Sequence, residues 1–546
     1  MRLSTKNTKD TKQDAKRLSC FSCISWIGFL FLLVLTACSS KPTDVRTVVP
    51  ANALVYLETQ DLGKALQAVT DNDAFRAAAT SQPDLSALNG IKVGVAVTGF
   101  ETKDLAGKNG SNEVSVQPRF VAVAETNAWN YQAIKFAENK LGEFVNDIYG
   151  GGVELERFPR FDGDYFVWTA DDGRKAYGLV IGSVIFFGND ETAIEKCVTV
   201  RKGEAESIAK NSKLPSGEFL ASGYVSPDGV AQISNLATIQ LAVGAGEEEE
   251  VRGFIARVLP EILRKSVKEV TWTATRDEPS KRINDQFSVE LEPEVSKVLS
   301  ESLAGGETDP DLGRFVPATF VSSTRYNLKD AQIAWRSVLL TAQSRTDSVS
   351  GNILSIVSSS LFEPYGVDDA ELFLSSIGNS IQTVKFDAEG EEVAGVARIR
   401  DLEKMKGALS KDVNLAAKPE SFENAEIWRS KDGEIAVGIV ERNVFFGEKS
   451  AVEKCLTARN NGQNLVGTFV LGPIFMSSKA PVVTAGTDNE TAKRVAAVLG
   501  AAKEGNESVS EPYTTETTFN NKGIERRTVS NLGVIGWVIE QFAKEQ

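Results

Sequence analysis

The feature that most constrains the fold of this chain is a long internal repeat. The segments 177–197 and 437–455 each contain an apolar, strand-like run, then Phe-Phe-Gly, then Glu-Lys-Cys. The matching tripeptides are Phe186-Phe187-Gly188 with Phe445-Phe446-Gly447, and Glu195-Lys196-Cys197 with Glu453-Lys454-Cys455. So long a period is typical of duplicated domains and not of a solenoid of short units. We therefore expect two tandem copies of one folding unit.

The similarity extends to both ends of the two copies. Val49-Pro50-Ala51 opens the first copy and Val316-Pro317-Ala318 opens the second, and each copy closes on an amphipathic helix after strand-like runs rich in Thr and Val. We assign unit 1 to residues 48–304 and unit 2 to residues 315–546. Residues 305–314 are assigned to a linker, because Gly, Asp and Pro are concentrated there.

Inside a unit, short strand-like runs come in groups with helices between the groups. The strand-like runs are 53–57, 92–98, 120–125 and several within 153–187, and helical spacing is found over 129–145 and 247–265. We expect the second of these helices to be interrupted near Pro260. Turn residues such as Asp171-Asp172-Gly173 leave links too short for a parallel crossover, which favours antiparallel pairing. The prediction is an α+β fold in two tandem copies, each a mainly antiparallel sheet with packed helices.

The first forty residues have the pattern of an export signal. Six Lys or Arg residues come before an uncharged segment from Leu18 to Ser40, and the apolar centre of that segment is followed by small residues. A basic region, a short apolar region and a small-residue cleavage point are typical of a secretory signal peptide. We predict that residues 1–37 form this signal and are removed on export.

The end of this segment, Leu35-Thr36-Ala37-Cys38, resembles the lipobox of bacterial lipoproteins. The resemblance implies that the Cys38 thiol receives a diacylglycerol, that Cys38 becomes the mature amino terminus, and that a palmitate-bearing lipid anchors the chain. Residues 38–47 would then be a tether, and Ser39 after the cysteine implies the outer membrane in a diderm bacterium and the cell membrane otherwise. An uncleaved signal anchor is the alternative. In both cases the body lies outside the cytoplasm, attached to a membrane.

Charge and composition exclude several classes of function. The formal net charge is −14, and loss of the basic signal would leave a more acidic body, so nucleic-acid binding is not expected. The chain contains no histidine. That absence excludes Ser-His-Asp and Cys-His catalysis and the usual histidine-containing zinc sites. Serine-lysine, paired-carboxylate and calcium chemistry stay open. No catalytic, cofactor-binding or metal-binding constellation emerges, and we expect no cofactor.

The repeated residues have a structural and a functional interpretation. Phe-Phe-Gly is expected to form a core joint between a strand and a helix, with the glycine in a tight turn, and a ligand-facing aromatic patch is the alternative. Cys197 and Cys455, one per unit, are expected to be small buried residues. A disulfide between them outside the cytoplasm and a thiol nucleophile are the alternatives.

Other motifs favour ordinary structural roles. Asp162-Gly163-Asp164 and Asp171-Asp172-Gly173 could contact calcium, but neither has EF-hand spacing, and hairpin turns use the same residues. Gly150-Gly151-Gly152 precedes a β run and does not open a helix, so we expect a turn and not a phosphate loop. The run Glu247 to Glu250 is expected to be a solvated helix start.

The Val-Pro-Ala opening, the strand and helix from Leu54 to Leu66 and the Phe-Phe-Gly joint resemble an uncharacterised family of bacterial envelope proteins, known only as a domain of unknown function. The resemblance covers most of both units. It implies an extracytoplasmic address, no activity and no site residue beyond Cys38. We predict a non-enzymatic envelope protein that binds another protein or the cell wall. The alternatives are a carrier of an apolar ligand, in a pocket lined by residues such as Phe186 or Phe445, and a histidine-free hydrolase.

Overall fold

The computed structural model describes residues 43–540 with gaps at 107–111, 245–249, 306–308, 318–319, 388–389, 461–473, 479–486 and 504–512. The chain divides into two units, Met1–Asp44 and Val45–Gln546, and the fold described below is that of the second unit. The lipobox and Cys38 lie outside the described residues. Among the helices that are described, none is long and apolar enough to cross a bilayer.

The first repeat contributes ten described strands to a sheet. Their bounds are β1 Val55–Thr59, β2 Lys92–Ala106, β3 Asn112–Glu125, β4 Glu154–Arg160, β5 Gly163–Thr169, β6 Lys175–Ile181, β7 Val184–Gly188, β8 Ala221–Val225, β9 Val267–Asp277 and β10 Arg282–Leu291. Each strand pairs antiparallel with its neighbours, in the order β4-β5-β6-β7-β3-β2-β1-β8-β9-β10.

The second repeat has the same strands in the same order. Their bounds are β11 Ser322–Asn327, β12 Ile377–Lys385, β13 Val393–Ile399, β14 Glu420–Phe422, β15 Ala425–Arg429, β16 Ile435–Val440, β17 Asn443–Glu448, β18 Ile474–Ser478, β19 Tyr513–Asn520 and β20 Gly523–Ser530. All pairs are antiparallel, in the order β14-β15-β16-β17-β13-β12-β11-β18-β19-β20. The identical order confirms two tandem copies of one α+β unit.

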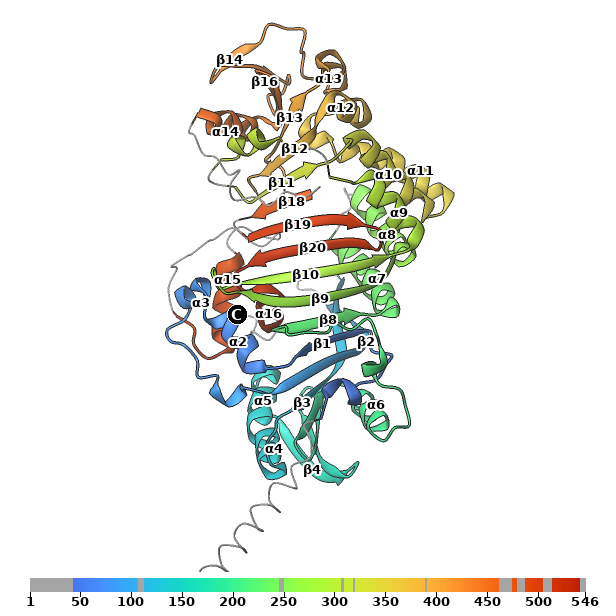
Figure 1. Ribbon diagram of the computed structural model, residues 1–546, viewed down its shortest axis with the longest axis vertical. Helices are drawn as coiled ribbons and strands as arrows, with labels where there is room; N and C mark the ends of the chain where they lie inside the picture. Colours follow the sequence, from blue (N-terminus) through green and yellow to red (C-terminus); the bar gives the residue numbers. More distant parts are fainter. Residues whose placement is uncertain are drawn as a thin grey trace, which may run out of the picture. The chain divides into compact units, whose positions relative to one another are not determined.

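The two repeats share one continuous sheet, because the last strand of each copy pairs with the last strand of the other. β10 and β20 run antiparallel, with Gln286 opposite Arg527 near the middle of the pair. Figure 1 shows the strands from β18 to β2 following one another across this junction. A strand that pairs antiparallel with its own counterpart is the arrangement expected of a local twofold relation between duplicated units.

The Phe-Phe-Gly joint connects the two faces of the sheet. Successive side chains of a strand point to opposite faces. Phe186 and Phe445 therefore enter the cores under α6 (Glu191–Arg201) and α14 (Lys449–Asn460), where Cys197 and Cys455 are also buried. The second phenylalanine of each pair, Phe187 or Phe446, enters the core on the other face. The prediction of a core joint is confirmed.

The helices on this second face are exchanged between the repeats. α16 (Gly533–Glu540) closes the second repeat, yet it packs on α2 (Leu62–Thr70) and β10 of the first. In the same way α9 (Pro293–Ser302), which closes the first repeat, packs on α10 (Ala331–Ser344) and β19 of the second. α15 (Thr487–Val498) likewise packs on α3 (Asp73–Ala78). The final helix of each repeat thus packs in the core of the other repeat.

The remaining helices include those predicted over 129–145 and 247–265. Their bounds are α4 Asn130–Phe136, a π-helical turn at Ala137–Leu141, α5 Gly142–Tyr149, α7 Pro227–Gly244, α8 Glu250–Ser266, α11 Ser348–Ser360, α12 Ala370–Ser376 and α13 Leu402–Ala408. The 3₁₀ turns are Val45–Val48, Ser86–Leu88, Ile208–Lys210, Pro310–Phe315 and Glu363–Tyr365. The expected interruption near Pro260 is wrong, because α8 continues through this proline. A proline removes one backbone donor, and a helix with enough other support tolerates that loss.

Candidate functional site

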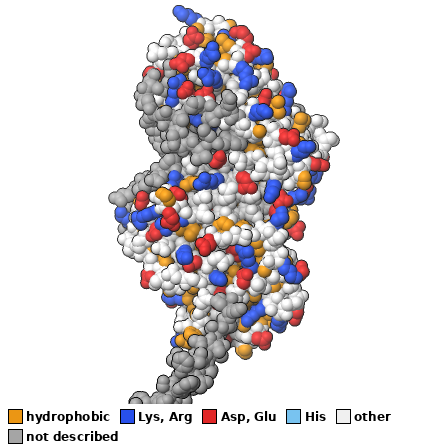
Figure 2. Space-filling model, in the orientation of Figure 1, with side chains coloured by type: hydrophobic (Ala, Val, Ile, Leu, Met, Phe, Trp, Pro, Cys, Tyr) orange, Lys and Arg blue, Asp and Glu red, His pale blue; other side chains and the backbone are white. Residues whose placement is uncertain are grey.

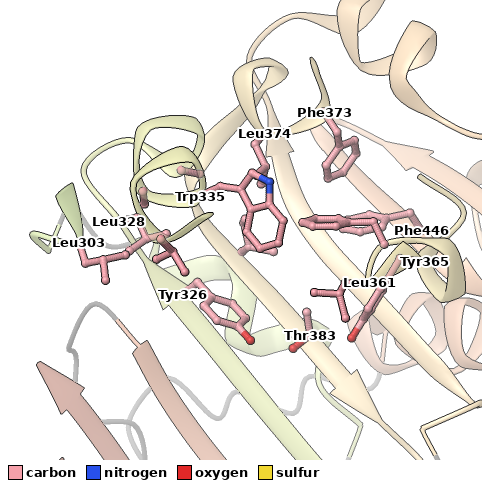
Figure 3. A pocket seen from close by; sticks show the side chains of 15 residues that line it. Leu303, Tyr326, Leu328, Trp335, Leu361, Tyr365, Phe373, Leu374, Thr383 and Phe446 are labelled. Atoms are coloured by element: carbon pink, nitrogen blue, oxygen red, sulfur yellow. The ribbon is translucent and has the colours of Figure 1, made fainter. Parts of the chain in front are cut away.

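A pocket of about 330 Å³ lies in the second repeat, between the sheet and the helices that cover it. Figure 3 shows side chains from strands, helices and turns converging on it. The residues that line it are Leu303, Tyr326, Leu328, Ala331, Ala334, Trp335, Val338, Leu361, Phe362, Tyr365, Phe373, Leu374, Ile381, Thr383 and Phe446. Cavities of this size, with mostly apolar walls and a few polar groups, are typical of small-molecule sites.

The floor of the pocket comes from one row of the sheet. In antiparallel pairs, residues directly opposite one another share a face, and here Thr383 of β12 lies opposite Gly395 of β13, which lies opposite Phe446 of β17. The Phe446 ring lies across Gly395, where a Cβ would come within 2.3 Å of it. This glycine therefore lets the ring lie flat and leaves space above it.

The same row in the first repeat carries a valine and an alanine. Val95 of β2 lies opposite Ala122 of β3, which lies opposite Phe187 of β7. By strand order and register, Val95 and Ala122 are the counterparts of Thr383 and Gly395 in the second repeat. The second repeat has thus exchanged a valine for a hydroxyl-bearing residue, and an alanine for a glycine, in the row beneath the pocket.

Helix α10 forms one wall of the pocket, and a capping residue fixes where this helix begins. The Asp330 carboxylate caps α10 by accepting from the Ile333 N–H at 2.9 Å. Helical spacing then turns Ala334, Trp335 and Val338 toward the pocket. The Trp335 ring is fixed edge-on against Phe362, with ring centroids 5.1 Å apart.

Aromatic contacts position the side of the pocket near Phe446. The Phe373 ring, from α12, meets the Phe446 ring edge-on with centroids 4.7 Å apart. Tyr365, in the turn after α11, lies 6.0 Å from the same ring in a tilted arrangement. Packing of this kind fixes the rotamers of the three rings. The shape of this side of the cavity therefore follows from contacts that the rings make with one another.

One wall belongs to the other repeat. Leu303 directly follows α9, the helix that the first repeat contributes to the second, and it lines the pocket beside Leu328. Figure 3 shows these two leucines together at one end of the cavity. The pocket is therefore complete only in the full duplicated chain.

The mouth of the pocket lies between α10 and the turn after α11. Val338 and Leu361 line the cavity and are 40% and 53% exposed. Large apolar side chains with so much exposure at a cavity rim mark a route from solvent to the interior. A ligand that enters there passes over apolar surface from the start.

The interior carries no formal charge, since none of the fifteen lining residues is charged. Its polar groups are the Tyr326, Tyr365 and Thr383 hydroxyls and the Trp335 indole N–H. Burial raises the pKa of Tyr326, and it raises the pKa of Tyr365 to about 12, so both phenols stay protonated at neutral pH. On the molecular face in Figure 2, the described acidic and basic side chains are interspersed.

In the first repeat, the counterparts of two pocket residues, Phe446 and Ala334, pack in or against hydrophobic clusters. The Phe187 ring meets Phe144 of α5 at 6.2 Å and Trp168 of β5 at 6.0 Å, both edge-on. On α2, Ala65 occupies the position that Ala334 has on α10, four residues after a capping aspartate, and it is buried in a packed cluster.

The pocket-lining residues named from the sequence are wrong by one position. Phe186 and Phe445 are fully buried on the opposite face of the sheet, where Phe445 packs edge-on against Phe315 at 4.9 Å. Phe446 is the phenylalanine that reaches the pocket. The joint glycines differ in backbone conformation: Gly447 has a φ of 136°, as expected of a turn, and Gly188 has no positive φ. Gly188 is required because a Cβ would meet the Phe120 carbonyl oxygen at 2.2 Å, which makes it a close-approach position.

The two cysteines are small buried residues, as predicted. Cys197 and Cys455 are free thiols in separate cores, so the alternative of a disulfide between them is wrong. Burial raises the pKa of each thiol to about 12. A thiol so fully protonated at neutral pH is a poor nucleophile.

The other motifs lie where hairpins turn. Phe161 and Asp162 adopt positive φ values of 55° and 61° between β4 and β5, the geometry of a tight hairpin turn. Asp172 pairs with Arg174 in the next turn. Gly150-Gly151-Gly152 has positive φ throughout and leads into β4, as expected of a turn. Within the described residues, no group of three or more potential ligands could hold a metal ion. Glu247 to Glu249 lie outside those residues.

Comparisons with known proteins add little to this geometry. No family model matches the sequence, and no curated protein matches it. Among solved structures, a duplicated taurocyamine kinase from Schistosoma mansoni with bound transition state analogue components aligns at 10% identity, over 90% of this chain and 81% of the kinase chain. The TM-score of that alignment is 0.14, which carries no argument about fold or activity.

Proposed function

We propose that this protein is a lipid-anchored, extracytoplasmic binding protein without catalytic activity, and that its second repeat holds an apolar ligand. The lipobox-like sequence ending at Cys38 supports the anchor and the address. The pocket supports the ligand, and it is the observation on which the proposal depends.

The chemistry of the pocket favours binding over catalysis. Its walls are aliphatic and aromatic, and the phenols and the threonine are the only hydroxyl groups among them. General acid–base or nucleophilic catalysis needs a group whose pKa lies near the working pH, beside a second group that activates or orients it. An apolar body buried here instead gains about 25 cal/mol for each Å² removed from water.

The fixed aromatic contacts also support a carrier. Phe446 is held by both Phe373 and Tyr365, and Trp335 is held by Phe362. A pre-formed cavity loses little conformational entropy when it is filled, which leaves more of the burial free energy for affinity. The second repeat thus has the properties of a ready-made receptor for a hydrophobic molecule.

Cavity filling tests the proposal. The protein is the chain from residue 38 onward with Cys38→Ser, which keeps the whole compact unit and removes the acyl chains that would compete. The uncharged fluorophore N-phenyl-1-naphthylamine is titrated into it. We expect saturable fluorescence enhancement that Ala334→Leu weakens and Ala334→Phe abolishes, while the thermal midpoint of Ala334→Phe stays the same or rises because the new ring fills empty space.

Ala65→Phe is the matched control, at the same helical position in the first repeat. It should lower the free energy of unfolding by about 1–3 kcal/mol through overpacking, and it should leave probe binding intact. Full probe binding by Ala334→Phe would contradict the carrier proposal.

Binding of another envelope protein or the cell wall is the second candidate, and one surface favours it. Trp129 and Tyr131, at the start of α4, are 68% and 60% exposed. Exposed aromatic residues are enriched at protein interfaces. Crosslinking in intact envelopes tests this candidate. A partner band that disappears in Trp129→Ala/Tyr131→Ala and persists in Trp537→Ala, a change at another exposed tryptophan, would support it. A band unaffected by either change would count against this surface.

A further inference from the structure

The three hydroxyl groups of the pocket lie on one side of it. Figure 3 shows the hydroxyl ends of Tyr326, Thr383 and Tyr365 along one side of the cavity, below the apolar side chains of Trp335, Phe373 and Leu374. Within the described part of the chain, the Tyr326 hydroxyl has no hydrogen-bond partner. Buried hydroxyls normally have a partner, so a hydroxyl that faces a cavity without one indicates a polar atom in whatever fills it.

Comparison of the two repeats gives an independent argument for a polar group at this side of the pocket. Tyr326 and Thr383 stand where the first repeat has Thr59 and Val95 in the corresponding strands. Valine and threonine have nearly the same shape, so the change from one to the other alters polarity and not volume. Thr59 also carries a hydroxyl, so the hydroxyl that this comparison makes specific to the second repeat is that of Thr383.

Charged groups are absent from the cavity lining, and the two arginines nearest to it in the sequence direct their side chains elsewhere. Arg336 is on α10 beside Trp335, but its guanidinium pairs with the Glu371 carboxylate at the exposed surface. Arg325 precedes Tyr326 and is buried, with its Nε donating to the Gln382 side chain at 2.9 Å. Because alternate residues of a strand face opposite sides, Arg325 points away from the pocket. The pocket lining therefore offers no counter-charge to an ionic head group.

From this arrangement we propose that the pocket binds an uncharged amphiphile, with an apolar body against Trp335, Phe373 and Phe446 and one neutral oxygen-bearing group, a hydroxyl or a carbonyl, at Tyr326 and Thr383. The proposal rests on the proposed carrier function and specifies its ligand class. A phenol can donate to a carbonyl and can both donate to and accept from a hydroxyl. A carboxylate or an ammonium would lose its hydration without gaining a counter-charge, which disfavours either inside an apolar cavity.

The test compares three amphiphiles that have similar alkyl chains and different head groups: decan-1-ol, decanoate and decyltrimethylammonium. Each displaces N-phenyl-1-naphthylamine from the same Cys38→Ser chain at pH 8, below the critical micelle concentrations of the charged chains. We expect decan-1-ol to bind at least tenfold more tightly than either charged chain. Tyr326→Phe and Thr383→Val, which keep shape and remove a hydroxyl, should each weaken decan-1-ol about five- to tenfold relative to the fluorophore.

Controls separate the possible failures. Tyr177→Phe removes a phenol from the core of the first repeat and should change none of these affinities. Equal binding of decanoate and decan-1-ol, or tighter binding of decyltrimethylammonium by the aromatic walls, would overturn the head-group assignment while leaving the carrier function standing. Decan-1-ol affinity that is unchanged in both hydroxyl variants would also overturn it. Failure of the fluorophore itself to bind would instead refute the carrier function.

Discussion

Phe446 lies directly opposite Gly395 in the β13–β17 pair, and its ring covers the space that a Cβ on Gly395 would occupy. The ring can lie flat against the sheet only because this position is a glycine. In the first repeat, the corresponding pair is Phe187 with Ala122. The two pairs differ by one methyl group, and Phe187 packs against the cluster that contains Phe166 and Trp168.

Gly395→Ala should push the Phe446 ring into the pocket. The added Cβ would meet the ring at 2.3 Å, which forces the ring to move away from the sheet. We expect a loss of about 1–3 kcal/mol in the free energy of unfolding, measured by urea denaturation, together with loss of probe binding.

Gly378→Ala is the control for backbone effects, since a Cβ there would have its nearest neighbour at 3.4 Å, in the Arg398 side chain. It should change unfolding and binding little. Normal probe binding by Gly395→Ala would show that Phe446 does not set the floor of the cavity.

The Arg46–Glu58 pair should hold the amino-terminal end of the folded body in place. Glu58 is buried and accepts from Arg46 Nε at 2.8 Å, from the Tyr56 hydroxyl at 2.9 Å and from the Ser222 hydroxyl at 3.0 Å. Glu58→Gln leaves the Arg46 charge without its counter-charge, so the free energy of unfolding should fall by about 3 kcal/mol. Glu143→Gln, in the exposed pair with Lys140, should change it by less than about 0.5 kcal/mol. Equal effects of the two changes in urea denaturation would refute the assigned role.

Asp285 should make stability depend on pH. Its carboxylate accepts from the Trp272 indole at 2.8 Å and the Val534 N–H at 3.1 Å, and burial raises its pKa to about 6. An unfolded aspartate titrates near ~3.9, so the folded state binds the proton more tightly. The resulting stabilisation is complete below about pH 4 and is lost as pH rises through 6.

The comparison of wild type with Asp285→Asn isolates this effect. The stability advantage of the wild type should shrink by up to about 3 kcal/mol between pH 4 and pH 7, as followed by urea denaturation at each pH. A difference between the two proteins that does not change with pH would show that Asp285 titrates normally.

Cys38 should carry the lipid. Cys38→Ala should abolish incorporation of labelled palmitate and release the body from the membrane fraction, while Cys23→Ala, in the predicted signal peptide, should leave both unchanged. Palmitate labelling that persists without the Cys38 thiol would refute the lipobox assignment.

The sequence was sufficient to predict the duplication and the class of fold. Phe-Phe-Gly and Glu-Lys-Cys recur in the same order, and turn residues such as Asp162 and Asp172 lie in links too short for a parallel crossover, which leaves hairpins. These signals are local in the sequence, so they can be recognised without knowledge of the tertiary structure. Cys197 and Cys455 are expected in cores for a different reason, since free cysteine is among the residue types most often buried.

The site was harder to predict, because adjacent residues of a strand belong to different cores. Phe445 and Phe446 have the same chemistry, and only the register of β17 against β13 decides which of them meets the cavity. Leu303 could not be assigned to the second repeat either, since helix exchange is not encoded in local periodicity. A usable signal did exist in the alignment of the repeats, where Thr383 and Gly395 replace Val95 and Ala122.

The exchange of closing helices has a consequence for biogenesis. α16, the last described helix of the chain, packs on α2, the first helix of the opening repeat, and Asn72 near that helix donates to the Asn531 carbonyl at 2.7 Å. A chain that crosses a membrane amino end first would expose the unfinished core of its opening half until the final residues had passed. Truncation of the last dozen residues should therefore damage the half of the protein that is synthesised first.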